Sequence, residues 1–251
     1  LMRIFRILYF KELKSYFLSP FGWLILCFAA LMQGFALTAT FKQFSDNAIP
    51  ESLVFVTFTS PIFGIYFLFL FPVLTMRLFS EENRSGTIEG LLTAPVRTWQ
   101  VILSKFSAAY TTFLSLWIVA VVHFYLFTVV TDVPPPFTNG ELVGAITVIA
   151  LMGMLFTAFG CLASALTSSQ IIAGVVCTAI LIFHIFLGFI PLLFGDQIPA
   201  APFFEFISSQ NHLREFSRGL IDTRTVIFYL STSVFFLFLT FHLLDFRRWK
   251  P

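Results

Sequence analysis

The chain has 251 residues, of which 58% are hydrophobic and 11% are charged, and its mean hydropathy is +0.90. This composition excludes an ordinary soluble domain, in which about a quarter of the residues are charged. The net charge of +2 says little by itself, and we expect no nucleic-acid partner. The three cysteines, Cys27, Cys161 and Cys177, lie apart within apolar runs, so we expect neither a disulfide framework nor a metal site.

The segment from Arg3 to Pro20 mixes basic and aromatic residues, and Pro20 and Gly22 separate it from the first apolar run. This mixture is typical of a helix that lies along the inner leaflet with its cations toward anionic head groups. Lys11, Glu12 and Lys14 are its central charged residues. A positive anchor that only fixes topology and a dedicated protein contact are equally good interpretations of this segment.

Six apolar runs follow, and none of them contains Lys, Arg, Asp or Glu. A spanning helix needs about 20 mostly apolar residues, and lipid offers the backbone no hydrogen-bond partner, so these runs must be helical. The sequence therefore predicts an all-α membrane protein with six transmembrane helices in a single domain, residues 1–251. The predicted spans are Phe21–Thr40, Leu53–Met76, Ser107–Val130, Leu142–Leu166, Ile171–Phe194 and Val226–Leu244.

Between the second and third spans lies the most polar stretch of the chain, Arg77 to Gln100. Gly86 is expected to interrupt the helix that leaves the second span, Thr87 to cap a new short helix, and Pro95 to end it. The sequence thus predicts a compact helical elbow. For a generic membrane protein, a solvated loop would be the simpler interpretation of such charges.

The stretch before the last span, residues 195–225, mixes apolar residues with charged ones such as Glu205 and Arg214. It predicts short amphipathic helices at the outer interface. They would either close the outer mouth of a pathway or only seal the bilayer interface.

The distribution of basic residues predicts the orientation. With the N-terminus in the cytoplasm, four of the 15 Lys and Arg residues lie outside, namely Lys42, Arg214, Arg218 and Arg224, and the other eleven lie inside. Because cytoplasmic loops carry an excess of Lys and Arg, we predict a multi-pass protein of the cytoplasmic (inner) membrane with both termini in the cytoplasm.

The elbow carries a resemblance to a known family. Residues 80–96, SEENRSGTIEGLLTAPV, resemble the cytoplasmic signature of ABC-2 type permeases, the membrane subunits of type V ABC exporters. Residues 11–20, KELKSYFLSP, are similar to the N-terminal connecting helix of that family, and most resemble the gliding-motility-associated subgroup. With the six spans, the resemblance covers essentially the whole chain.

This resemblance implies that two permease chains, identical or related, sit on two cytoplasmic ABC ATPase subunits, in some systems with an accessory membrane protein. It also implies that the elbow between spans two and three is a cytoplasmic coupling helix, which docks into the ATPase. Glu82, Gly86, Thr87 and Glu89 match the signature, Arg84 lies among them, and Glu81 is an alternative equivalent of Glu82.

No ATP-binding loop is present, because the chain contains no Gly-Lys pair. We therefore expect no catalytic residue, metal or cofactor in this chain, and ATP bound by the partner subunit. Two alternatives remain: a structural or anchoring component of a gliding or cell-surface machinery, and a proton-driven carrier built on His123, His184 and His242. For these histidines we favour neutral, hydrogen-bonded packing roles.

Overall fold

The computed structural model describes residues 2–46, 51–87, 90, 96–131, 137–194 and 200–249. Throughout these ranges the regular structure is helical, with no strand, which confirms the predicted all-α class. Six described helical segments are long and apolar enough to cross a membrane: Pro20–Phe44, Pro61–Ser85, Thr98–Leu126, Asn139–Leu166, Gln170–Pro191 and Thr223–Phe246. The count of six spans agrees with the sequence.

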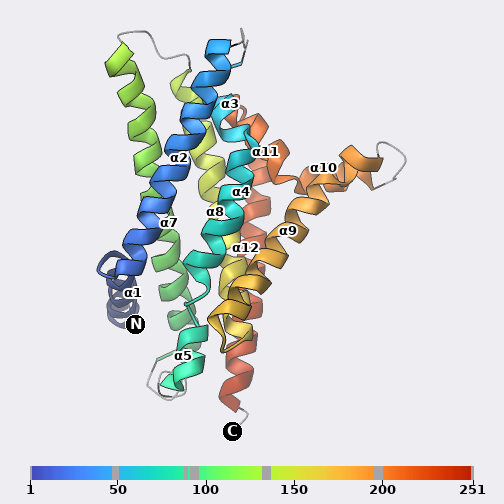
Figure 1. Cartoon of the computed structure of the whole chain (residues 1–251). Helices are drawn as coiled ribbons and strands as arrows, with labels where there is room; N and C mark the ends of the chain where they lie inside the picture. Colours follow the sequence, from blue (N-terminus) through green and yellow to red (C-terminus); the bar gives the residue numbers. More distant parts are fainter. Residues whose placement is uncertain are drawn as a thin grey trace.

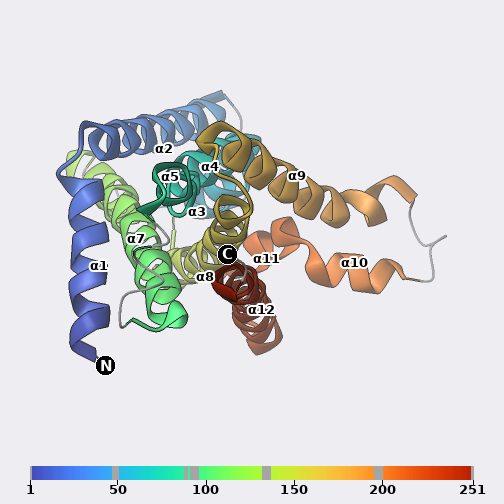
Figure 2. The same ribbon diagram turned by 90° about the horizontal axis from the view of Figure 1, so that it is seen from below.

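The long helices run side by side, and both termini lie at the same end of the bundle (Figure 1). The short helix α5 also lies at this end, whereas α3 and α11 lie in the opposite half (Figure 1). Seen along the bundle, α1 lies across this end beside α7 (Figure 2). The helices are α1 (Met2–Phe17), α2 (Pro20–Asp46), α3 (Leu53–Thr59), α4 (Pro61–Thr75), α5 (Ser80–Ser85), α7 (Thr98–Thr131), α8 (Asn139–Leu166), α9 (Gln170–Phe194), α10 (Ala201–Ile207), α11 (Ser209–Ser217) and α12 (Thr223–Trp249).

Helix α8 is the centre of the bundle and packs against α4, α7, α9, α11 and α12. A Cβ atom added at Gly160 of α8 would lie 2.0 Å from Thr75 Oγ1, so the absence of a side chain there lets α4 approach closely. Many of the phenylalanines form an aromatic core around Trp117, with Phe63 stacked at 5.8 Å and Phe113 edge-on at 5.9 Å. Other large apolar side chains face outward on α9 and α12, as lipid contact requires.

The second predicted span is wrong in one respect: it is not a single helix from Leu53 to Met76. Helix α3 ends at Thr59, Ser60 adopts an extended conformation, and α4 begins at Pro61. A proline disfavours the helical conformation of the residue before it, yet fits well at the first position of a helix. The chain therefore breaks at Ser60, and α3 becomes a separate short helix.

The other predicted elements are found with shifted ends. Helix α7 begins at Thr98, nine residues before the predicted start at Ser107, so the end of the polar stretch already belongs to a long helix. The segment before the last span contains two short helices, α10 and α11, as predicted. Thr138 and Glu141 form a reciprocal capping box at the start of α8, which was not predicted from the sequence.

Candidate functional site

The polar stretch between the second and third spans folds as an elbow at the end of the bundle that holds both termini (Figure 1). After α4 the chain turns through residues 76–79 and forms α5, which ends where Gly86 adopts a left-handed conformation with φ 70°. Gly86 therefore breaks the helix as predicted, because a left-handed residue cannot continue it. Thr87 is helical again, while Glu89 lies outside the described residues.

A buried ion cluster joins three separate segments behind this elbow. The Lys105 ammonium on α7 lies 3.0 Å from Glu12 Oε1 on α1 and 2.9 Å from Glu82 Oε1 on α5. We call these three residues the Lys105 junction. The Lys105 side chain is only 5% exposed, and those of Glu12 and Glu82 are 14% and 17% exposed. The junction thus connects the N-terminal helix and the elbow through a single cation on a spanning helix.

The surroundings of the junction make its charges depend on one another. Lys105 Nζ also lies 5.6 Å from the ring centroid of Phe79, which is a cation–π distance. The second oxygen of Glu82, Oε2, is buried and has no hydrogen-bond partner among the described residues. A buried carboxylate costs free energy unless it is paired, so Lys105 is the main compensation for Glu82.

Hydrogen bonds from α8 fix the start of α5. Ser164 Oγ accepts from the backbone N–H groups of Phe79 and Ser80, at 2.9 and 3.1 Å, and donates to the Met76 carbonyl at 3.1 Å. The first N–H groups of a helix have no partner inside the helix, so this hydroxyl serves as a cap supplied by another segment. Asn83 adds a hydrogen bond to the Thr167 carbonyl at 3.2 Å, just beyond the end of α8. Helix α5 is therefore held by both α7 and α8.

The opposite face of the elbow is exposed. Glu81, Arg84, Gly86 and Thr87 are all exposed, and Glu81 accepts a bidentate hydrogen-bonded ion pair from Arg77 at 3.1 and 3.3 Å. The two neighbouring glutamates that the signature could not distinguish thus have different positions. Glu82 points into the Lys105 junction, and Glu81 lies on the outer face.

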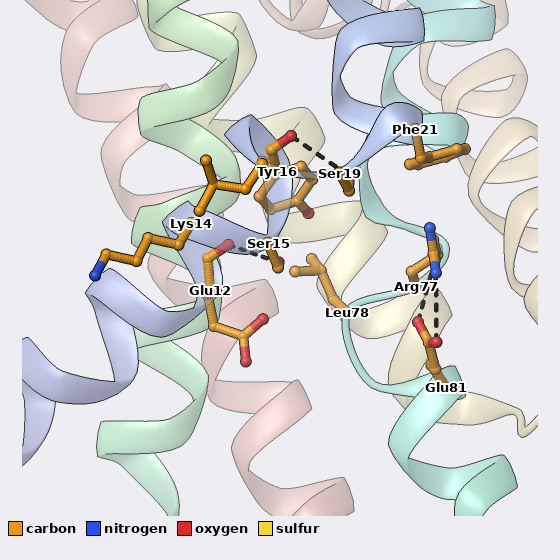
Figure 3. A pocket seen from close by; sticks show the side chains of 10 residues that line it. Glu12, Lys14, Ser15, Tyr16, Ser19, Phe21, Arg77, Leu78 and Glu81 are labelled. Atoms are coloured by element: carbon orange, nitrogen blue, oxygen red, sulfur yellow. Dashed lines mark hydrogen bonds and ion pairs between the residues drawn. The ribbon is translucent and has the colours of Figure 1, made fainter.

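A cavity of about 360 Å³ separates α1 from the elbow (Figure 3). Tyr16 lies at its back and donates a hydrogen bond to the Leu74 carbonyl at 2.7 Å, which fixes α1 to the last turn of α4. Lys14 lines the cavity with its ammonium group directed away from Arg77 (Figure 3). Lys11 is exposed and lies 3.9 Å from Glu12. Of the three charged residues predicted on α1, only Glu12 thus reaches the buried junction.

The histidines of the spans differ in their surroundings. His184 Nε2 lies 2.8 Å from Ser209 Oγ, which confirms the predicted hydrogen-bonded packing role for this residue. For His123 that role stays a prediction; its buried Nδ1 has no hydrogen-bond partner within the part of the chain that the structure describes. His242 is exposed, and its ring contacts that of Phe238 at 4.3 Å. No group of three or more potential metal ligands occurs in the described ranges.

Sequence reasoning missed two residues of this site. Lys105 was counted only as one more cytoplasmic cation, although it is the single charge in the described part of α7 and lies between Trp99 and a long apolar run. That isolation was a signal, because a lone cation within an apolar helix must find a counter-ion. Ser164 gave no signal, since a serine in an apolar run is common and its partners come from another helix.

Six helices long and apolar enough to span a membrane, with a charged elbow at one end that is held by α7 and α8, define a multi-pass membrane protein. A family model described as ABC-2 family transporter protein matches residues 38–243, well over half of the chain. The chain therefore belongs to the ABC-2 transporter family, and it is a permease subunit of an ABC transporter, a membrane component without catalysis of its own. The match includes the elbow and Lys105 but not α1. None of the curated proteins compared with the chain matches it.

Proposed function

We propose that this chain exports a substrate across the cytoplasmic membrane, driven by ATP that a separate cytoplasmic ABC ATPase subunit binds and hydrolyses. The proposal rests chiefly on the Lys105 junction, where the elbow, the N-terminal helix and a spanning helix share one buried cation. The family supports an ABC ATPase as partner, and a second permease chain completes the proposed complex. The excess of basic residues on the segments near α5 supports a cytoplasmic position for the elbow and both termini.

The geometry supports a division of roles within the elbow. Arg84, Gly86 and Thr87 lie on the exposed face, where a partner protein can contact them. Glu82 lies behind them in the Lys105 junction, 2.9 Å from Lys105. A displacement of α5 by the ATPase would therefore be transmitted to α7 through this ion pair and to α8 through Ser164, instead of being absorbed by a loose loop. We assign docking to the exposed face and coupling to the buried one.

Two substitutions separate these roles. Arg84→Glu reverses an exposed charge and is expected to weaken assembly with the ATPase, because charge complementarity sets docking specificity. Glu82→Gln keeps the exposed face intact, so the complex should assemble while ATP hydrolysis no longer responds to the permease. The measurements are the amount of ATPase that co-purifies with the tagged permease and the ATPase rate of the complex in nanodiscs.

The outcomes distinguish transport from the anchoring alternative. If no ATPase co-purifies with the wild-type chain, or if both variants behave like wild type in both measurements, the proposed coupling is wrong. A purely anchoring component predicts that assembly survives in every variant and that no substrate changes ATP hydrolysis. The gliding-motility subgroup stays a prediction from residues 11–20, and deletion of the gene in a gliding host, followed by a surface-motility assay, tests it.

A further inference from the structure

Four buried polar side chains form a continuous hydrogen-bond chain in the half of the bundle opposite the elbow. His184 Nε2 on α9 lies 2.8 Å from Ser209 Oγ on α11, Tyr229 on α12 donates to the same oxygen at 3.0 Å, and His212 Nδ1 lies 3.2 Å from the Tyr229 hydroxyl. All four residues are less than 9% exposed, and Tyr229 is fully buried. We call this set the outer hydrogen-bond chain. It connects α9 to α12 through α11.

The number of available protons decides which group donates and which accepts at each contact of the outer hydrogen-bond chain. Tyr229 has one hydroxyl proton and donates it to Ser209, so the contact between Tyr229 and His212 requires His212 to donate its Nδ1 proton. The Ser209 proton is then free to be donated to His184 Nε2, which accepts. In this arrangement each of the three contacts has one donor and one acceptor. Removing one member therefore leaves buried donors or acceptors without a partner.

Close backbone contacts show that α11 fits tightly in its position. A Cβ atom added at Gly144 of α8 would lie 2.1 Å from the Phe216 carbonyl oxygen, and one added at Gly188 of α9 would lie 2.9 Å from Ser208 Oγ. Just beyond the C-terminal end of α11, Arg218 pairs with Glu51 at 2.9 Å and lies 4.6 Å from the ring centroid of Phe55 on α3. A side chain at Gly144 would push α11 out of this position, because it would clash with a backbone carbonyl.

Helix α10, by contrast, carries exposed apolar side chains such as Phe203, and it extends beside α9 away from the bundle (Figures 1 and 2). The outer segment is therefore fixed mainly through α11. Within α11, Ser209 is bonded to α9 and to α12 at the same oxygen. Since both bonds are already at ordinary hydrogen-bond length, α9 and α12 cannot move apart at this level while both bonds persist.

We propose that the outer hydrogen-bond chain positions α11 between α9 and α12 in the resting state, and that it must break when the outer half of the permease opens during transport. This inference rests on the proposed transport function. It assigns a positioning role to Ser209 and Tyr229, with His184 and His212 as the terminal partners. Breaking the chain leaves buried polar groups unpaired, which disfavours opening in the absence of the ATPase stroke.

Hydrogen exchange of the α11 amides in nanodiscs tests the resting-state part of the proposal. Tyr229→Phe should accelerate exchange in Ser209–Ser217 about tenfold or more, because it removes two buried hydrogen bonds. The control Tyr110→Phe removes a tyrosine hydroxyl that bonds the Ala150 carbonyl between α7 and α8, and it should leave α11 unchanged. Equal exchange of α11 in both variants and the wild type would overturn the proposal.

A pair of substitutions at His184 separates the hydrogen bond from simple packing. His184→Gln places an amide oxygen where Nε2 accepts, so it should preserve slow exchange of α11, whereas His184→Leu removes the acceptor and should accelerate exchange. If both variants have the same effect, bulk packing and not the hydrogen bond positions α11.

A disulfide tests whether α11 must leave its position. A Cβ atom added at Gly188 lies 3.2 Å from Ser208 Cβ, close to the roughly 3.8 Å of a disulfide, so Gly188→Cys with Ser208→Cys should cross-link α9 to α11 on oxidation. The experiment uses the co-purified ATPase complex with Cys27 replaced by serine. We expect oxidation to abolish the response of ATP hydrolysis and reduction to restore it. Unchanged activity of the cross-linked complex, or a loss that reduction does not reverse, would overturn the proposed opening.

These results are distinguishable from failure of the transport proposal itself. If the wild-type complex shows no coupled ATP hydrolysis, the proposed transport function is wrong. The exchange measurements still decide whether the outer hydrogen-bond chain positions α11.

Discussion

Replacing Lys105 with methionine removes one ammonium group and keeps a side chain of similar length. The carboxylates of Glu12 and Glu82, each within 3.0 Å of that ammonium, are 14% and 17% exposed. After the substitution Glu82 has lost its ion pair, and Glu12 keeps only the exposed Lys11 at 3.9 Å. Breaking a buried ion pair by removing one partner typically costs about 3–5 kcal/mol. Because the two carboxylates retain some contact with water, we expect a loss near the lower end, about 3 kcal/mol.

The assay is a denaturant or thermal unfolding series in detergent micelles. Wild type is compared with Lys105→Met and with the neutral triple variant Lys105→Met, Glu12→Gln and Glu82→Gln. The triple variant removes the charge repulsion, so it should recover most of the lost stability. A Lys105→Met variant as stable as wild type, or a triple variant less stable than Lys105→Met alone, would refute the assignment of a buried, mutually compensating junction.

Three further predictions concern orientation, pH and the cap of α5. An impermeant maleimide should label Asp222→Cys in intact spheroplasts but Thr87→Cys only after permeabilisation; the reverse pattern would place the elbow outside. Burial lowers the pKa of His212 in the folded protein to about 4. As the pH falls below about 6.5, His212 is therefore protonated in the unfolded state before it is protonated in the folded state. The free energy of unfolding should consequently decline by up to about 1.4 kcal/mol per pH unit between pH 6.5 and 4. His212→Asn, which keeps a donor, should show a smaller decline in the same unfolding series, and an equal decline would exclude His212 as the cause. Ser164→Ala should destabilise the protein by about 2 kcal/mol, because the backbone N–H groups of Phe79 and Ser80 lose their acceptor. The control Ser231→Ala, at an exposed position, should leave stability unchanged. Equal effects of the two substitutions would contradict the capping role of Ser164.

The sequence predicted the class of fold and the number of spans because the requirement for paired backbone groups in lipid leaves few solutions. It missed the break at Ser60, although the following Pro61 was a local signal for it. The apolar run continued through this position, and hydrophobicity alone does not report a helix break. The position of Gly86 was predictable because a glycine that follows a short polar helix is a common helix end.

The candidate site was predictable only in part. The elbow residues could be selected from their local pattern, but the contact between Glu12 and Glu82 through Lys105 joins positions separated by up to 93 residues. No local pattern reports which helices a tertiary contact brings together. The outer hydrogen-bond chain shows the same limit, because His184 was predicted to be hydrogen-bonded, while its partner Ser209 and the tyrosine bonded to that serine, Tyr229, were not identified.

Photo-crosslinking from the elbow tests the central claim most directly. A photoreactive amino acid at Thr87, on the exposed face of the elbow, is activated in native membranes, and the same residue at Asp222 serves as the control on the opposite side. Our account predicts that Thr87 captures an ABC ATPase subunit and that Asp222 does not. Capture of no ATPase from Thr87, or capture of the ATPase from Asp222, would contradict it.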